Sequence, residues 1–165
     1  MAQLTGIGAG VKVVQAEFIP LFGADDIAPD GAAFDQLLDD GQRLPLGGLE
    51  IEVMASPGHT PACVAYKVGG ALFVGDTMFM PDLGTARCDF PGGDAVLLYR
   101  SLRRMLSLDG ETRIFVCHDY PCEARPQVAW ETSVAAQRAG NIHVRDGVSE
   151  ADYVAMRTAR DATLE

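Results

Sequence analysis

Three short stretches of this sequence place a side chain that can bind a metal directly after an apolar run. The three side chains, in chain order, are His59, Asp76 and His118. Short apolar runs bounded by Gly or Pro are typical of buried strands, so each side chain is expected at the end of a strand. Two imidazoles and a carboxylate that meet at one point are donors that both zinc and iron accept. The pattern therefore predicts a zinc or iron site held by strand ends.

Each stretch also has an ordinary structural interpretation. His59 could be a loop histidine bonded to the backbone, because Gly and Pro are common beside turn residues. Asp76 could cap the turn that follows its strand, and His118 could be a core histidine. The three stretches in this order are more specific than any one of them.

Length, composition and charge limit the classes of function. The chain has 165 residues, 48% of them hydrophobic, which is enough for one globular domain over residues 1–165. A formal net charge of −10 argues against a nucleic-acid surface and against an anionic membrane partner. No apolar run approaches the roughly 20 residues that span a bilayer. The four cysteines form no Cys-x-x-Cys pair and residues 1–4 carry no basic charge. Free thiols, small buried hydrophobes in character, and a cytoplasmic location are therefore expected.

The first half of the chain predicts a helix followed by antiparallel strands. Residues 6–10 are glycine-rich but lack the G-x-G-x-x-G spacing, so we expect a loop that enters a helix at Val11. Pro20 should bend or end that helix. Glycine pairs between apolar runs predict two hairpins, because both turn positions can take positive φ. The pairs are Gly47-Gly48 and Gly69-Gly70.

The second half predicts a functional loop, one strand and three helices. The irregular loop over residues 77–93 is long enough to be functional. Asp94 should cap a helix whose apolar stripe contains Leu98 and Leu102 and whose arginines face water. A strand should end at His118. Two helices should follow, over about residues 127–139 and about residues 150–162, the second with Ser149 as its N-cap.

The order of these motifs resembles the metallo-β-lactamase superfamily, and more closely its persulfide dioxygenase and glyoxalase II-like branch. Residues 56–62, 73–77 and 117–120 are similar to three of the family's metal motifs, and residues 80–93 and 141–147 are similar to persulfide dioxygenase-related members. The resemblance implies an α+β sandwich of two mixed sheets with helices outside. This chain would supply one largely antiparallel sheet, a fragment of the other sheet and the flanking helices.

The sequence departs from the family in one respect. The family carries an earlier T-H-x-H-x-D-H motif, whereas the three histidines here are His59, His118 and His143, so none precedes His59. The resemblance therefore implies a fold that is incomplete at its N-terminus, either truncated or complemented by another polypeptide. We expect His143 to be a surface histidine that cannot replace the absent ligands.

The resemblance also implies roles for individual residues. In the persulfide dioxygenases, His59 and Asp76 would join a histidine of the absent motif around one iron. In the two-metal hydrolases, Asp76 would be the central catalytic carboxylate that bridges the metals, and His118 would bind the second. Arg87 and Tyr120 are candidates for binding a small glutathione-like substrate. For Arg87, a salt bridge to a nearby aspartate is the open alternative.

Three hypotheses about function follow. With three ligands at best, the isolated chain should bind zinc or iron weakly and catalyse poorly or not at all. It is then an incomplete metalloenzyme, a non-catalytic binding or assembly module, or a complementing subunit of a split enzyme. If the first strands of the sandwich are absent, the apolar inner face of the remaining sheet has no opposite layer to cover it. Leaving about 800 Å² of this apolar surface exposed would cost roughly 20 kcal/mol at about 25 cal/mol per Å². Since a second copy is the nearest cover, a homodimer or other homo-oligomer is expected.

Overall fold

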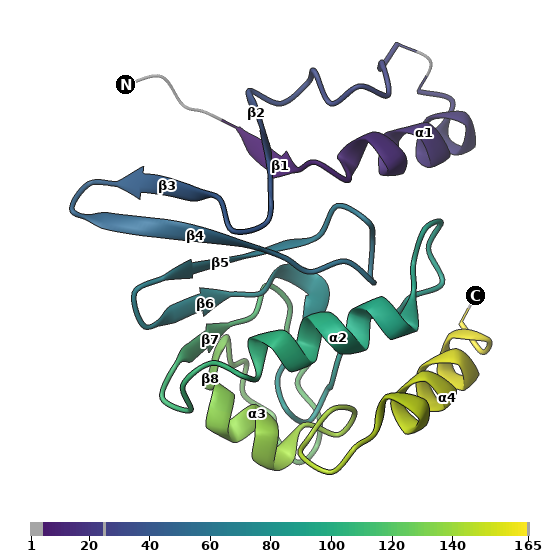
Figure 1. The fold of residues 1–165 in the computed structure, drawn as a ribbon. Coiled ribbons are helices and arrows are strands. Elements are labelled where there is room, and N and C mark those ends of the chain that lie inside the picture. Colours follow the sequence, from purple (N-terminus) through teal and green to yellow (C-terminus); the bar gives the residue numbers. More distant parts are fainter. Residues whose placement is uncertain (1–4, 25, 165) are drawn as a thin grey trace.

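We describe the protein from a computed structural model that covers residues 5–24 and 26–164 (Figure 1). The described residues form a two-stranded sheet, a six-stranded sheet and four α-helices. In chain order the elements are β1 (Gly6–Gly8), α1 (Val11–Phe22), β2 (Gln36–Leu38), β3 (Arg43–Leu46), β4 (Leu49–Ala55), β5 (Val64–Val68), β6 (Ala71–Phe73), the 3₁₀ turn η1 (Gly75–Thr77), α2 (Ala95–Met105), β7 (Arg113–Phe115), β8 (Glu131–Ser133), α3 (Val134–Gly140) and α4 (Glu150–Asp161).

The main sheet has the strand order β3-β4-β5-β6-β7-β8, and only its β6–β7 pair is parallel. The two expected hairpins are confirmed, since β3 pairs with β4 and β5 pairs with β6, each in antiparallel register. A parallel neighbour requires a crossover connection, and α2 supplies it between β6 and β7. The expected α+β class with a largely antiparallel sheet is confirmed.

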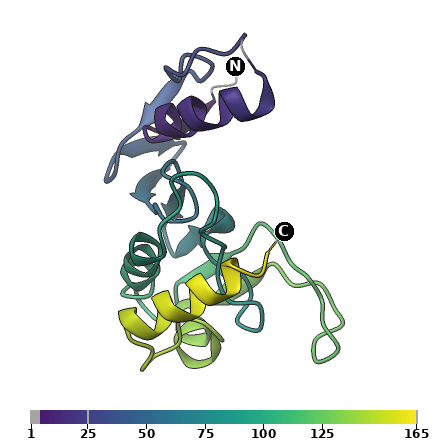
Figure 2. The same ribbon diagram turned by 90° about the vertical axis from the view of Figure 1, so that its right-hand side faces the viewer.

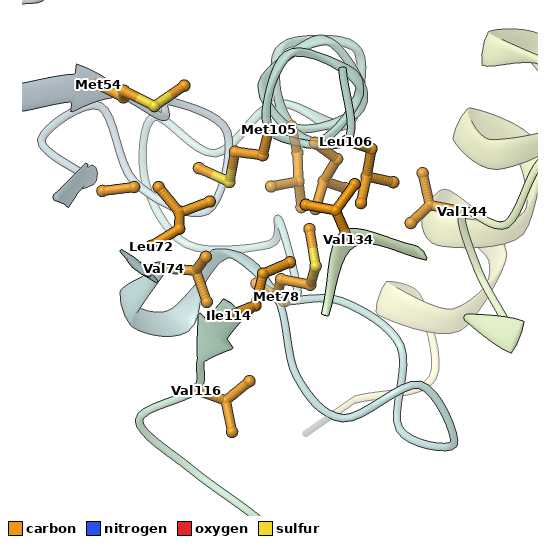
Figure 3. Packing of buried hydrophobic residues seen from close by; sticks show 14 of the residues in the cluster. Met54, Leu72, Val74, Met78, Met105, Leu106, Ile114, Val116, Val134 and Val144 are labelled. Atoms are coloured by element: carbon orange, nitrogen blue, oxygen red, sulfur yellow. The ribbon is translucent and has the colours of Figure 1, made fainter. Parts of the chain in front are cut away.

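The core lies between the sheet and α2 (Figure 3). Asp94 caps this helix, because its Oδ1 accepts the backbone N–H of Val96 at 2.7 Å and of Leu97 at 2.9 Å. The expected apolar stripe is confirmed: Leu98 and Leu102 are fully buried in the cluster that also contains Leu72 from β6 and Ile114 from β7. The arginines of α2 do not face water alone, since each forms an ion pair. The pairs are Arg100–Glu150, Arg103–Asp146 and Arg104–Asp40.

Several expectations about individual elements are wrong. Residues 6–10 are not all loop, because Gly6–Gly8 forms β1 and pairs in parallel with β2. Of the two effects expected of Pro20, an end of the helix at that residue is wrong, because α1 continues to Phe22. The helix expected from about residue 127 begins only at Val134, and the edge strand β8 precedes it. The final helix begins after Ser149 as expected, with the Ser149 Oγ accepting the backbone N–H of Asp152 at 3.1 Å.

Two further observations concern membrane-spanning helices and the four cysteines. None of the described helices is long and apolar enough to cross a bilayer. All four cysteines are free, but Cys117 and Cys122 are exposed, so these two are not the small buried hydrophobes that were expected. Residues 1–4, whose lack of basic charge entered the expectation of a compartment, lie outside the described residues.

Candidate metal and substrate site

The loop that carries His59 is anchored to the first turns of α2. The Gly58 carbonyl accepts the Asp94 backbone N–H at 2.8 Å, and the Ser101 hydroxyl donates to the Pro57 carbonyl at 2.8 Å. Gly58 has φ +135°, and a Cβ on it would lie 2.3 Å from the Leu98 backbone. Only glycine tolerates this conformation and this contact. The Pro-Gly-His order therefore places His59 against the helix with little freedom.

Hydrogen bonding leaves the outer nitrogen of His59 free to bind a metal. Its Nδ1 lies 2.8 Å from the Arg87 carbonyl oxygen, which can only accept a hydrogen bond, so Nδ1 carries the proton. The lone pair is then on Nε2, which lies 3.8 Å from Asp76 Oδ2. A ligating histidine commonly donates its second N–H to a backbone carbonyl. His59 thus has the partner that a metal ligand requires.

Asp76 lies between the two imidazoles. It follows β6 in η1, and its neighbour Thr77 donates to the buried Ser56 hydroxyl at 3.2 Å, which joins this turn to the His59 loop. Asp76 Oδ2 faces His59, and Asp76 Oδ1 lies 3.0 Å from His118 Nε2. The structure therefore brings together His59, Asp76 and His118, the three expected ligands.

Cys117 is a fourth possible donor that the sequence analysis did not consider as a ligand. Its Sγ donates to Asp76 Oδ1 at 2.8 Å, and the ligand atoms of Asp76, Cys117 and His118 all lie within 4.8 Å of one another. Its position directly before His118 was a signal that could have identified it. Imidazole nitrogen, carboxylate oxygen and thiolate sulfur are all zinc ligands, and iron accepts them too, so the residues present fit such a metal.

The loop that follows His118 is held by a charge network that the sequence analysis missed. Asp119 accepts from the Arg125 guanidinium at 2.6 and 2.7 Å and from the Ala129 backbone N–H at 2.7 Å. Arg125 also donates to Asp82 at 3.0 Å. The hydrogen bonds from Arg125 hold the pKa of Asp119 below its usual value. This network fixes the base of a loop that extends away from the sheet between β7 and β8 (Figure 2).

The three candidate ligands line a cavity of about 460 Å³. The two expected substrate residues, Arg87 and Tyr120, line it as well. The Arg87 guanidinium is paired with Asp89, as its alternative interpretation anticipated, and it also lies 5.1 Å from the Phe90 ring centroid.

The same cavity is lined by His143 and, from α4, by Arg157 and Arg160. His143 is only 5% exposed, so the expectation of a surface histidine is wrong. The reason is that the segment between α3 and α4 folds inward: the Asn141 side chain accepts the backbone N–H groups of His143 at 2.8 Å and of Val144 at 3.1 Å.

Comparison with known proteins places these motifs in a family. The Metallo-beta-lactamase superfamily profile matches residues 5–118. A probable metallo-hydrolase of Burkholderia pseudomallei is 54% identical over 96% of this chain and 58% of its own length. Glyoxylase B2 of Dictyostelium discoideum is 46% identical over 98% of this chain and 56% of its own length. The chain thus spans little more than half the length of these relatives.

Two further relatives match a little over half of this chain. The human mitochondrial persulfide dioxygenase ETHE1 is 37% identical over 54% of this chain and 36% of its own length. A hydroxyacylglutathione hydrolase of Aeromonas hydrophila is 39% identical over 56% of this chain and 35% of its own length.

Solved structures share the fold. The crystal structure of ETHE1 from Myxococcus xanthus matches 93% of this chain and 78% of its own, with a TM-score of 0.69 and 24% identity. TTHA1623 in a di-iron-bound form matches 83% of this chain and 63% of its own, with a TM-score of 0.59 and 28% identity. Profile, relatives and fold agree, and the chain belongs to the metallo-beta-lactamase superfamily, with glyoxalase and persulfide dioxygenase homologues.

Proposed function

We propose that the protein is a metal-dependent enzyme of the thiolester hydrolase type, acting on a small glutathione-like thiol derivative. The observation that carries this proposal is the position of Asp76, which presents one carboxylate oxygen to His59 and the other to His118. A carboxylate placed in this way suits a site for two metal ions, because it offers two oxygens and a charge that offsets the cations. The hydroxyacylglutathione hydrolase relative supports the substrate class.

The chain's own residues have distinct roles in this proposal. His59, Asp76 and His118 would hold the metal, with Cys117 beside Asp76 and His118 as a further donor. When bound, zinc or iron polarises a carbonyl oxygen and lowers the pKa of a water molecule. The Arg125–Asp119 pair holds the loop that positions His118 and Tyr120. Tyr120 and Arg87 line the cavity where the thiol-derived part of the substrate would lie.

A second candidate activity is persulfide oxidation at a single iron. The match to human persulfide dioxygenase ETHE1 favours it, and iron accepts the same imidazole and carboxylate donors. Two assays divide the candidates: release of thiol from a glutathione thiolester, and oxygen consumption with glutathione persulfide. Each assay is made with zinc-loaded and with iron-loaded protein.

The isolated chain is expected to hold metal weakly and to turn over slowly. Two imidazoles and one carboxylate leave a tetrahedral site one protein donor short, and a thiol that is hydrogen-bonded to Asp76 must lose its proton before it can bind. Elemental analysis of the purified chain should therefore find well under one equivalent of zinc or iron. One or two tightly held metals per chain would contradict this expectation.

Zinc titration by calorimetry tests the site itself. His59→Ala and Asp76→Ala should each abolish the binding that remains, whereas His143→Ala should not, because the His143 ring is hydrogen-bonded to Thr85 and has no contact with Asp76 among the described ion pairs and hydrogen bonds. Equal losses in all three variants would mean that the metal binds elsewhere. A chain that binds no metal but takes up a protein partner saturably would instead favour a binding module or a complementing subunit.

A further inference from the structure

His118 is the candidate ligand whose orientation has the least direct support. The His59 ring donates from Nδ1 to the Arg87 carbonyl oxygen at 2.8 Å, a partner of the kind that fixes a ligating imidazole. The His118 ring lies 3.0 Å from Asp76 through its Nε2, but its Nδ1 has no hydrogen-bond partner among the described residues. Its side chain is 54% exposed, against 13% for His59. The position of His118 therefore depends on the loop that carries it.

A short hairpin over residues 78–85, here called the platform hairpin, is fixed by buried side chains. The Phe79 backbone N–H donates to the Gly84 carbonyl at 3.0 Å, which closes the hairpin. Gln137 of α3 is fully buried, and its Nε2 donates to the Phe79 carbonyl at 2.7 Å. Asn141, also fully buried, donates from Nδ2 to the Gly84 carbonyl at 3.2 Å. Both arms of the platform hairpin are thus bonded to the segment at the end of α3.

The platform hairpin reaches His118 in two ways. The ring centroid of Phe79 lies 6.5 Å from that of His118. In the turn of the hairpin, Asp82 Oδ2 accepts from Arg125 Nε at 3.0 Å. The Nη1 and Nη2 of Arg125 donate to the two carboxylate oxygens of Asp119, the residue after His118, at 2.7 and 2.6 Å. A guanidinium carries its donors in a rigid fork, so Arg125 holds these two carboxylates at a fixed separation.

The surroundings of Arg125 favour a positioning role over an ordinary surface ion pair. Its backbone N–H and carbonyl bond to those of Cys122 at 3.0 and 3.1 Å, so the residue sits in a closed turn. The Asp119 side chain is only 4% exposed. An ion pair between exposed side chains contributes little, whereas charge-assisted bidentate bonds add both strength and geometric specificity. The link between Asp119 and the platform hairpin is therefore specific in geometry.

We propose that Arg125 is a positioning residue for His118: by joining Asp119 to Asp82, it ties the His118 loop to the platform hairpin and holds the imidazole beside Asp76. Arg125 does not line the cavity, so it acts through Asp119. The inference rests on the proposed function, because it concerns a ligand of the proposed metal site. It adds the group that orients the one ligand without a hydrogen bond of its own.

Nuclear magnetic resonance of the metal-free full chain measures the position of His118 directly. A nuclear Overhauser effect between the rings of His118 and Phe79 should be present in the original chain and lost in Arg125→Lys. Lysine keeps the charge, but its ammonium group cannot hold two carboxylates in a fixed geometry. Arg100→Lys is the matched control, because Arg100 forms a similar two-bond pair with Glu150 between α2 and α4. The control should keep the effect.

Zinc titration by calorimetry provides a second measurement, extended to millimolar zinc because the original chain binds weakly. Arg125→Lys should weaken binding by about 10–100-fold, the loss typical when a partner that orients a ligand is removed. Asp82→Asn leaves the Arg125–Asp119 pair in place and should weaken binding by a smaller factor. The double variant should lose no more than Arg125→Lys alone, since both changes break one link. Arg100→Lys should bind zinc as the original chain does.

Two results would overturn the positioning role: unchanged zinc affinity in a folded Arg125→Lys variant, and an undiminished effect between His118 and Phe79 in that variant. If Arg125→Lys does not fold, the same two measurements on Asp82→Asn decide. If His59→Ala abolishes zinc binding but Arg125→Lys leaves it unchanged, the metal site stands and the role of Arg125 fails. If Arg125→Lys displaces His118 but His59→Ala leaves zinc binding unchanged, Arg125 positions the ring and the proposed metal site fails.

Discussion

The two faces of the six-stranded sheet carry similar side chains but differ in what covers them. On one face, Leu72 of β6 and Ile114 of β7 are 0% exposed beneath α2 (Figure 3). On the other face, Phe73, the next residue after Leu72, is 44% exposed. Leu72 and Phe73 are neighbours in one strand, and successive strand residues point to opposite faces. A difference in strand propensity therefore does not explain why one is buried and the other exposed. The contrast shows that burial in this protein depends on which elements pack on the sheet.

The less covered face has a continuous aromatic row across three strands, in which Phe73 is exposed and Tyr66 and Phe115 are half-buried. Tyr66 pairs with Phe73, and Phe73 pairs with Phe115, whose rings stack at a centroid distance of 5.0 Å. The Arg113 guanidinium lies 4.9 Å from the Phe115 ring centroid. Tyr66, Phe73 and Phe115 are here called the open row. Leu72 and Val74, on either side of Phe73 in the sequence, are by contrast fully buried.

The largest expected effect concerns association through the open row. We propose that a second copy of the chain covers it, because an aromatic row flanked by one cation, Arg113, and one anion, Glu131, can be complementary to itself under twofold symmetry. In this arrangement Phe73→Glu should weaken association by about a thousandfold, since each interface would lose two central aromatic contacts worth about 2 kcal/mol each.

Light scattering at micromolar concentration measures this association. Val13→Glu, an exposed apolar residue on α1 away from the open row, is a control for added charge and should leave the molar mass unchanged. A well-folded monomer of the original chain at that concentration would refute the homo-oligomer.

The next effect compares adjacent residues on the two faces. Leu72→Ala should lower the free energy of unfolding by about 2–5 kcal/mol, because it leaves a cavity beneath α2. Phe73→Ala should cost well under half as much in the monomer, since its side chain is already partly solvated. Urea denaturation at a protein concentration below the association range measures both variants. Equal losses would mean that the two faces are equally covered.

The sequence predicted the covered face better than the elements at its edges. The two hairpins, the Asp94 cap and the stripe on α2 follow from glycine pairs, a capping side chain and helical periodicity, which are local signals. Strand β8 was missed because Glu131, Thr132 and Ser133 are polar and pair on one side only. Strand β1 was missed because its glycines have low strand propensity, and only the distant β2 stabilises it.

The candidate site likewise contains residues that could be predicted from the sequence and residues that could not. His59, Asp76 and His118 each follow an apolar run, so their convergence could be predicted from the strand ends. Arg125 could not be identified as the partner of Asp119, because the loop that brings them together has no periodic pattern. The burial of His143 depends on Gly84, which lies far away in the sequence. Contacts of this kind need the tertiary structure.

A third prediction uses His143, whose side chain is buried and neutral near neutral pH. Its pKa is about 4 in the folded protein against 6.5 for an ordinary histidine. The unfolded chain therefore binds a proton that the folded chain does not bind between these values, and stability must fall as the pH falls from 6.5 towards 4. The loss from this group is about 3 kcal/mol in total and stops below the folded pKa.

Urea denaturation at several pH values between 4 and 7 measures that loss. His143→Gln cannot titrate, so its free energy of unfolding should depend less on pH over this window, whatever its absolute stability. The carboxylates with lowered pKa, such as Asp119, lose their stabilising contribution only at the acid end. Parallel pH profiles for the variant and the original chain would exclude His143 as the source.

The smallest expected effect comes from removing the N-cap of α2, the helix that covers one face of the sheet. Asp94 accepts two backbone N–H groups at the start of α2, the helix that buries Leu72 and Ile114. Asp94→Ala should cost about 1 kcal/mol in the free energy of unfolding, whereas Asp94→Ser, which keeps a capping oxygen, should cost less. Because the Asp94 backbone N–H still donates to the Gly58 carbonyl, the His59 loop stays anchored in both variants. Zinc affinity measured alongside urea denaturation should therefore be unchanged, and a parallel fall in both quantities would show that the cap also positions His59.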